Sequence, residues 1–293
     1  KNIDFAYVLG LSQLRHEWDQ QDADDRKPKY RWKDTKQVLA EQKNTGTRFT
    51  QNIDRLSISG SRGKLDWRLG RQAVTFGVAR IISPVDIFRP YPYQAIDQEY
   101  RYGVDAVRMT YVTGETSEID VGLVLGEKEE SLTKNSFIRF HDFWKDLDYE
   151  FVLVKGPYSE HYGLSLKGAL SGAGIWIDGA YIKPKPHLSE PYYAISLGTE
   201  YMLRGETYVF VEFHHDSSGA RNQQDYEASS KRFAISYAGS FFLGKDYLGV
   251  GVTKQLTPLL ALNSSLVGNL NDGSALCQVV LDYNVVEDIY FGG

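Results

Sequence analysis

Apolar and polar residues alternate with a period of two along most of the chain, and this pattern constrains the fold more than any other feature. In residues 162–170, for example, Tyr162, Leu164, Leu166 and Leu170 alternate with small or charged residues. Successive side chains of a β-strand point to opposite faces, so such a run predicts a strand with one apolar face. Only short candidate helices interrupt these runs. We therefore predict an all-β fold.

Turn sequences rich in glycine, serine, asparagine and aspartate separate many of the runs. They lie at residues 60–63, 114–115, 171–174, 204–206, 244–246 and 271–274. Long polar connections lie at residues 19–50, 73–102, 127–147 and 216–230. In the first half of the chain, these long connections alternate with the short turn sequences. A closed bacterial barrel prefers an even number of strands. We predict one domain over residues 1–293, a closed antiparallel transmembrane β-barrel of about 14–16 strands.

Charged residues recur on the second face of the predicted strands. They include Arg55, Asp66, Arg68, Arg108, Asp120, Lys167, Asp178, Glu200, Glu212 and Asp282. Buried in a dry core these charges would be costly, but the interior of so wide a barrel is wet. Tyrosine and tryptophan near strand ends suit the two membrane interfaces. The alternative is a soluble β protein with cross-strand aromatic pairs, and the charged second face favours the membrane barrel.

Composition excludes several other classes of protein. The single cysteine, Cys277, excludes a disulfide framework, a cysteine-based zinc or iron–sulfur site and a Cys-x-x-Cys-His haem attachment, and its alternation with Val279 predicts that it faces lipid. A net charge of −5 argues against a nucleic-acid partner. Adjacent His214 and His215 would point to opposite faces of a strand and would not share one metal ion. No catalytic motif is present, so we expect no enzyme and no cofactor.

The most specific motifs lie within residues 69–108. They read LGRQ at residues 69–72, FG at 76–77, SPVDIFRP at 83–90 and IDQEYRYGVDAVR at 96–108. These motifs resemble those of bacterial outer-membrane porin-like barrels, and the broad style is similar to that of the alginate-export type. Weaker likenesses occur at residues 162–168 and 256–274. The resemblance implies an outer-membrane channel of a Gram-negative bacterium without naming its substrate.

Residues 73–102 form a long, aromatic and charged connection within a barrel sequence. Ser83 followed by Pro84 indicates a helix start, and Pro90 and Pro92 would end that helix. We expect the segment to fold inward and narrow the lumen; the alternative is a rim loop packed on itself. The predicted lumen and constriction residues are Asp66, Arg68, Arg89, Asp97, Glu99, Arg101, Arg108, Asp120, Lys167 and Glu212.

We expect passive diffusion of small hydrophilic solutes, contacts with outer-membrane lipid and lipopolysaccharide, and weak ion selectivity because the inward charges are of mixed sign. The connection at residues 127–147 is rich in aromatic residues, and the connection at 19–50 includes a candidate helix over 36–42. Loops of this kind could bind a partner protein. The alternative function is therefore a barrel that sheathes or docks a partner on its loops or in its lumen, such as a multihaem cytochrome of an electron conduit.

Overall fold

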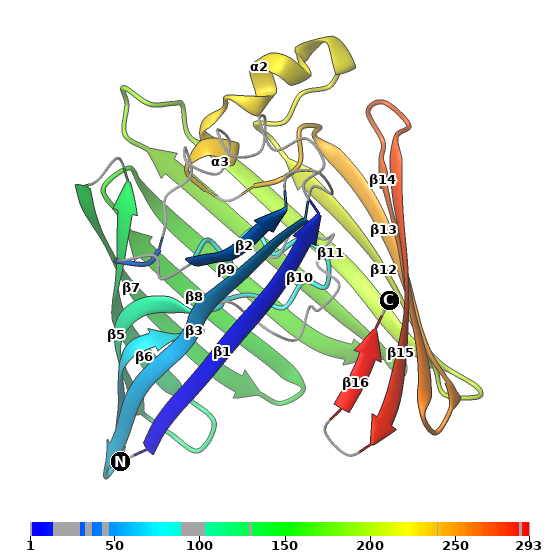
Figure 1. Ribbon diagram of the computed structural model, residues 1–293. Helices are drawn as coiled ribbons and strands as arrows, with labels where there is room; N and C mark the ends of the chain where they lie inside the picture. Colours follow the sequence, from blue (N-terminus) through cyan, green and yellow to red (C-terminus); the bar gives the residue numbers. More distant parts are fainter. Residues whose placement is uncertain are drawn as a thin grey trace.

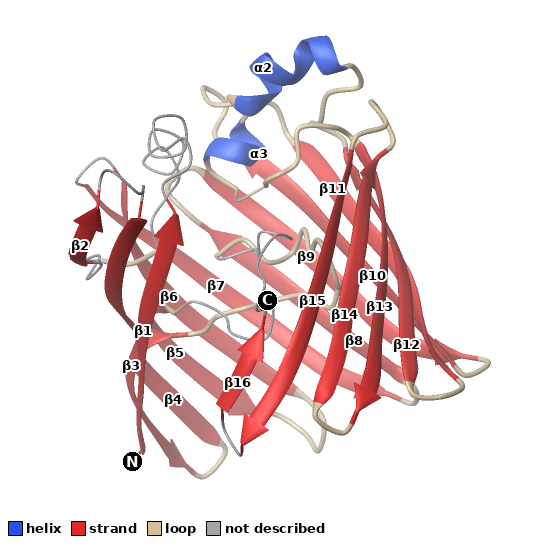
Figure 2. Ribbon diagram, turned by 45° about the vertical axis from the view of Figure 1, so that its right-hand side comes forward, coloured by secondary structure: helices blue, strands red, loops and turns tan. Residues whose placement is uncertain are grey.

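The computed structural model describes residues 2–13, 30–32, 37–42, 47–88, 103–128, 131–238, 240–286 and 289–292. Strands dominate this part of the chain, and the helices gather at one end (Figure 2). The strands are β1 (Asn2–Gln13), β2 (Gln37–Gln42), β3 (Thr47–Arg62), β4 (Leu65–Gln72), β5 (Val104–Val112), β6 (Glu118–Lys128), β7 (Ser131–Trp144), β8 (Leu147–Lys155), β9 (Ser159–Leu170), β10 (Ala173–Pro184), β11 (Tyr192–Leu203), β12 (Thr207–Asp216), β13 (Asp246–Thr257), β14 (Leu260–Asn269), β15 (Ala275–Val286) and β16 (Ile289–Gly292).

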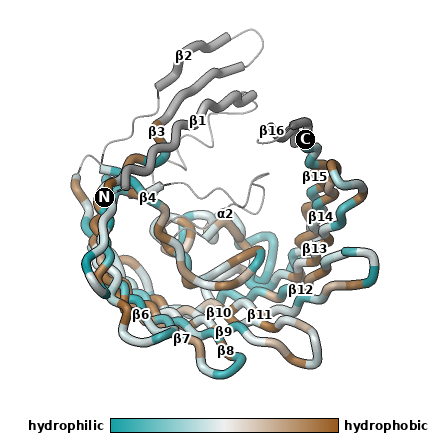
Figure 3. Tube along the Cα trace, turned by 90° about the horizontal axis from the view of Figure 1, so that it is seen from below, coloured by the Kyte–Doolittle hydropathy of each residue, from teal (hydrophilic) through white to brown (hydrophobic). Residues whose placement is uncertain are grey.

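The strands form one 16-stranded sheet in which β1 pairs with β3 and each strand from β3 onward pairs with the next, antiparallel throughout. β2 pairs with residues 47–51 of β3, a part of that strand which β4 does not reach. Viewed along the strands, β4 to β15 curve around a central space (Figure 3). β1 and β16 stand at the two edges of the sheet (Figure 1), and no pairing joins them among the described residues.

The two ends of the sheet differ. One end carries tight turns, such as Ser171 and Gly172 between β9 and β10, whose φ angles of 51° and 84° suit a two-residue hairpin. The other end carries the connection over residues 217–245, with the short helices η1 (Gln223–Asp225), α2 (Tyr226–Ser230) and α3 (Phe233–Ser236) (Figure 1). Each helix of the described chain is too short to cross a membrane.

One face of the strands is apolar and exposed, and the other is covered. On β10, Ile175, Ile177 and Tyr181 are exposed, while the alternating Trp176 and Asp178 are buried. Cys277 lies on the exposed face of β15, as its alternation predicted. The outer face of the sheet is therefore apolar, and the polar residues lie on the side toward which it curves.

Three local predictions were wrong. Residues 131–144 form strand β7 and not part of a long loop. The prediction failed because the covered face of this strand carries the polar residues Thr133 and Asn135, which weaken the apolar–polar alternation. Residues 37–42 form strand β2 instead of a helix, since they pair with β3. Ser83 begins only a turn, closed by the Asp86 amide donating to the Ser83 carbonyl at 3.3 Å.

Candidate functional site

The chain leaves β4 at Gln72 and crosses the covered face of the sheet; we call residues 73–88 the inward connector. The prediction that this segment folds inward is met for these sixteen residues, which bond to strands as distant as β12. The rest of the predicted segment, residues 89–102, lies outside the described chain. The candidate site therefore consists of the inward connector and the side chains that bind it to the covered face of the sheet.

Glu212 of β12 accepts hydrogen bonds from the middle of the inward connector. Its carboxylate accepts the backbone N–H groups of Arg80, Ile81 and Ile82 at 2.6, 3.1 and 2.9 Å, and the Trp176 indole N–H at 3.1 Å. Only 2% of Glu212 is exposed. Four donors thus satisfy a buried carboxylate that would otherwise be costly.

Asp178 of β10 holds the preceding part of the connector in the same way. It accepts the amides of Val78 and Ala79 at 2.9 and 3.0 Å, and the Ser83 hydroxyl at 2.6 Å. The Ser83 hydroxyl, predicted to cap a helix, thus serves as a donor to Asp178. Gly77 has a φ of +85°, and a Cβ there would lie 2.0 Å from the Ser83 hydroxyl oxygen.

Glu150 of β8 joins the connector to an ion-pair network. It accepts the amide of Gly77 at 2.8 Å and pairs with Arg139 of β7. Arg139 also pairs with Glu118 of β6 at 2.7 Å. We call Glu150, Asp178 and Glu212 the carboxylate seat of the connector, since each accepts at least one of its backbone N–H groups.

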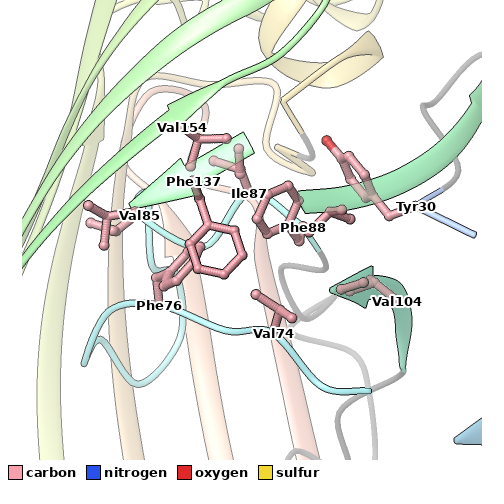
Figure 4. Close-up of a cluster of buried hydrophobic side chains, with 12 residues drawn as sticks. Tyr30, Val74, Phe76, Val85, Ile87, Phe88, Val104, Phe137 and Val154 are labelled. Carbon is pink, nitrogen blue, oxygen red and sulfur yellow. The ribbon is translucent and has the colours of Figure 1, made fainter. Parts of the chain in front are cut away.

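The two ends of the inward connector pack on an aromatic cluster (Figure 4). Phe88 is fully buried, with its ring centre 5.1 Å from that of Tyr30 and 5.9 Å from that of Phe76. Phe76 in turn lies 5.3 Å from Phe137 of β7. We call Tyr30, Phe76, Phe88 and Phe137 the aromatic seat. Its burial fixes the ends of the connector without directional bonds.

A second segment, residues 30–32, also reaches the covered face. Arg31 pairs with buried Asp54 at 2.5 Å and donates to the Gly103 carbonyl at 2.9 Å. The Trp32 amide donates to Asp105 at 2.8 Å. These bonds place Tyr30 against Phe88, so two segments from separate connections meet inside the sheet.

The predicted lumen residues fall into three groups. Arg89, Asp97, Glu99 and Arg101 lie outside the described chain. Four residues lie on β4 to β6. Arg68 of β4 is the cross-strand partner of Arg108 of β5, and Arg108 forms an ion pair with buried Asp120 of β6. Asp66 of β4 is exposed. Lys167 lies 3.4 Å from Glu200, and Glu212 lies beneath the connector. Asp120 and Glu212 therefore support the wall and are not accessible to a solute.

Sequence reasoning missed Arg80, Arg139 and Glu150. The alternation of Glu150 with outward Phe151 and Leu153 carried a signal for an inward position. Nothing in the sequence indicates that its partner is the amide of Gly77, 73 positions away. The local sequence therefore predicts that Glu150 faces inward, but it does not predict which group Glu150 binds.

The two adjacent histidines have separate partners. The Nδ1 atom of buried His214 lies 2.8 Å from the Ser196 hydroxyl, and that of His215 lies 2.7 Å from Asp246. Within the described chain no group of three or more potential ligands could hold a metal ion.

Comparisons with known proteins give the fold. No protein-family model matches the chain, and no curated protein matches it by sequence. A loop L8 deletion mutant of OmpT, an outer membrane protein of Vibrio cholerae, is 9% identical with a TM-score of 0.50, over 95% of this chain and 97% of that one. This likeness concerns the fold alone.

Two further solved structures are similar at lower scores. OccAB1 of Acinetobacter baumannii is 10% identical over 84% of this chain and 70% of its own, with a TM-score of 0.49. An anion-selective porin from Comamonas acidovorans is 13% identical over 78% and 76%, with a TM-score of 0.45.

Proposed function

We propose that residues 1–293 form one closed β-barrel in the outer membrane of a Gram-negative bacterium and conduct small hydrophilic solutes by passive diffusion. The observation that carries this proposal is the pairing of an apolar outer face with a charged inner wall, in a sheet of the kind found in an outer-membrane protein. Lipid and lipopolysaccharide would contact the outer face. The end with long connections would face outward from the cell, and the tight turns would face the periplasm.

The inward connector would narrow the pore. Arg68, Arg108, Asp66 and Lys167 would line the lumen, with Arg89, Asp97, Glu99 and Arg101 of the same connection contributing to the constriction. Asp120 and Glu212 would support it from behind. Because both signs are present, the proposed pore has weak ion selectivity.

The inward connector also bears on the alternative function. A barrel that sheathes a partner such as a multihaem cytochrome needs its interior for that partner, whereas here the chain's own residues 73–88 lie against inner-wall side chains of β8 and β12. This observation supports a non-enzymatic channel over a sheath. The broad likeness of the sequence to the alginate-export type fits a channel and names no solute.

Single-channel recording in a planar bilayer tests the proposed function. Folded protein, identified by its heat-modifiable migration in gel electrophoresis, should give stable open steps with a reversal potential near zero in a salt gradient. A folded protein that gives no conductance would contradict the channel. A strongly shifted reversal potential would contradict the weak selectivity but not the channel itself.

A further inference from the structure

A small pocket lies at the end of the sheet that carries the long connections, where three of these connections meet. Its lining includes Tyr30 of the 30–32 segment, Ile87 of the inward connector and Tyr237 at the end of α3. Residues of β7, β8 and β9 and of the turn over 156–158 complete the lining. Tyr30 and Ile87 belong to the buried cluster of Figure 4. Parts of the chain that are far apart in sequence thus enclose one space.

Gly156 keeps this space open. On the covered face of the sheet it lies between Asn135 of β7 and Ser159 of β9, and its backbone N–H donates to the Ser159 carbonyl at 2.9 Å. A Cβ at position 156 would lie 2.3 Å from the Asn135 Oδ1 atom. The glycine therefore leaves the Asn135 amide free to face the pocket.

Three polar side chains of the lining have unpaired groups within the described chain. The Thr133 Oγ1 and His161 Nδ1 atoms have no hydrogen-bond partner, and the two residues are only 5% and 6% exposed. The Asn135 amide, in a residue that is 8% exposed, also makes no side-chain hydrogen bond among the described residues. Buried polar groups are normally paired, because an unpaired one destabilises the fold. The set indicates an occupant with hydrogen-bonding groups.

The pocket offers no counter-charge to an ionic occupant. Its lining contains no carboxylate, lysine or arginine. Lys134, Lys155 and Glu160 alternate with lining residues and so lie on the opposite, outward face of their strands. Asp86 precedes Ile87 in the connector but is buried and does not line the pocket. Since an unpaired charge is costly to bury, the occupant is expected to be neutral.

Tyrosine rings form much of the apolar wall. The Tyr237 ring centre lies 4.9 Å from that of Tyr158, and the Tyr237 ring stacks on Phe233 of α3 at 5.0 Å. Tyr30 packs edge to face on Phe88 at 5.1 Å. Rings held in this way offer flat apolar surface to the carbon skeleton of a ligand, while a few polar groups orient it.

We propose that this pocket binds a small neutral polyol. A ligand hydroxyl both donates and accepts, so it can pair with the Thr133 hydroxyl, the Asn135 amide and either tautomer of His161. The unfilled space is about 330 Å³, including a part that is open to solvent, and this upper limit admits only a small molecule. The inference goes beyond the proposed channel, since it depends on the described fold and not on conduction.

Glycerol is the probe, and anionic glycerate is its charged counterpart. Saturation-transfer NMR on the folded, detergent-solubilised full chain should detect glycerol binding and no glycerate binding, with empty micelles as the blank. Crystals grown without polyol and then soaked in glycerol identify the occupant directly. One glycerol within hydrogen-bond distance of Thr133, Asn135 or His161 is the expected result.

Two variants locate the site. Thr133→Val and Asn135→Leu should each weaken glycerol binding by about fivefold, the scale of one neutral hydrogen bond. Both replace an unpaired buried group by an apolar one, so the urea midpoint without glycerol should stay equal or rise. Thr199→Val removes an exposed hydroxyl on the outer face of β11 and is the matched control. If one pocket variant does not fold, the other carries the test.

The outcomes separate this inference from the proposed function. Glycerol binding that Thr133→Val or Asn135→Leu weakens and Thr199→Val does not would support the site, whether or not the protein conducts. An ordered water alone in the glycerol-soaked pocket would overturn it and leave the channel standing. Equal binding by all three variants, or glycerate binding as strong as glycerol binding, would also overturn it.

Discussion

The carboxylate seat and the aromatic seat hold the same connector by different physics. In the carboxylate seat, Asp178 and Glu212 accept individual backbone N–H groups, so they fix the path of the chain residue by residue. In the aromatic seat, Phe88 and its neighbours exclude water and hold the ends of the connector without directional bonds. Hydrogen bonds therefore set where the connector runs, while burial supplies much of its stability.

Deletion of residues 80–98 should have the largest effect, because it removes Phe88 of the aromatic seat and the three backbone N–H groups that Glu212 accepts. With the constriction gone, the single-channel conductance should rise roughly twofold or more while the barrel still folds. Planar-bilayer recording of heat-modifiable protein measures this. Unchanged conductance of a folded deletion variant would mean that the segment does not narrow the pore.

Phe88→Ala removes one ring of the aromatic seat and leaves the carboxylate seat unchanged. The loss of a fully buried ring should lower the free energy of unfolding by about 3–5 kcal/mol, since a cavity remains where the ring was. Urea unfolding followed by tryptophan fluorescence measures it. Phe151→Ala, at an exposed position on the outer face of β8, is the control and should cost less. Equal losses in the two variants would contradict the role given to the aromatic seat.

Glu212→Gln removes one charge from the carboxylate seat and keeps the size of the side chain. The amide keeps one acceptor oxygen but loses the charge that four N–H donors share, so we expect a loss of about 2–3 kcal/mol and a larger conductance as the connector leaves the wall. The matched control is Asp282→Asn on β15, whose carboxylate accepts the Asn263 amide N–H at 2.7 Å. A Glu212→Gln channel with wild-type conductance would show that hydrogen bonds do not set the connector's path.

Gly249→Ala tests the packing of the inward connector against β13 and should have the smallest effect. A Cβ at Gly249 of β13 would lie 2.0 Å from the Cδ1 atom of Ile81, so the end of that side chain must shift, at a cost of about 1 kcal/mol. Gly268→Ala on β14 is the control, since its Cβ would meet nothing closer than 3.9 Å. The two variants are compared by urea unfolding. A Gly249→Ala variant as stable as Gly268→Ala would mean that Ile81 is loosely packed.

Much of the fold could be predicted from local sequence pattern. The alternation at residues 162–170 gave a strand, and 171–174 gave its turn, because both depend on neighbours in the chain. The pattern failed at residues 131–144, where polar Thr133 and Asn135 occupy the covered face. A strand whose inner face accepts polar residues carries a weaker signal than one packed on a dry core.

The sequence by itself determined the all-β class, the inward position of charges such as Asp178 and Glu212, and the unusual character of the connection after β4. Only the tertiary structure decided what the inward charges do. Asp178 and Glu212 are 100 and 132 positions from the amides of Val78 and Arg80 that they accept, and Arg80 meets Glu200 at a separation of 120. Alternation reports the face of a residue, because side-chain direction is local. Partners across the inner wall follow from the curvature and register of the whole sheet, which no short stretch of sequence contains.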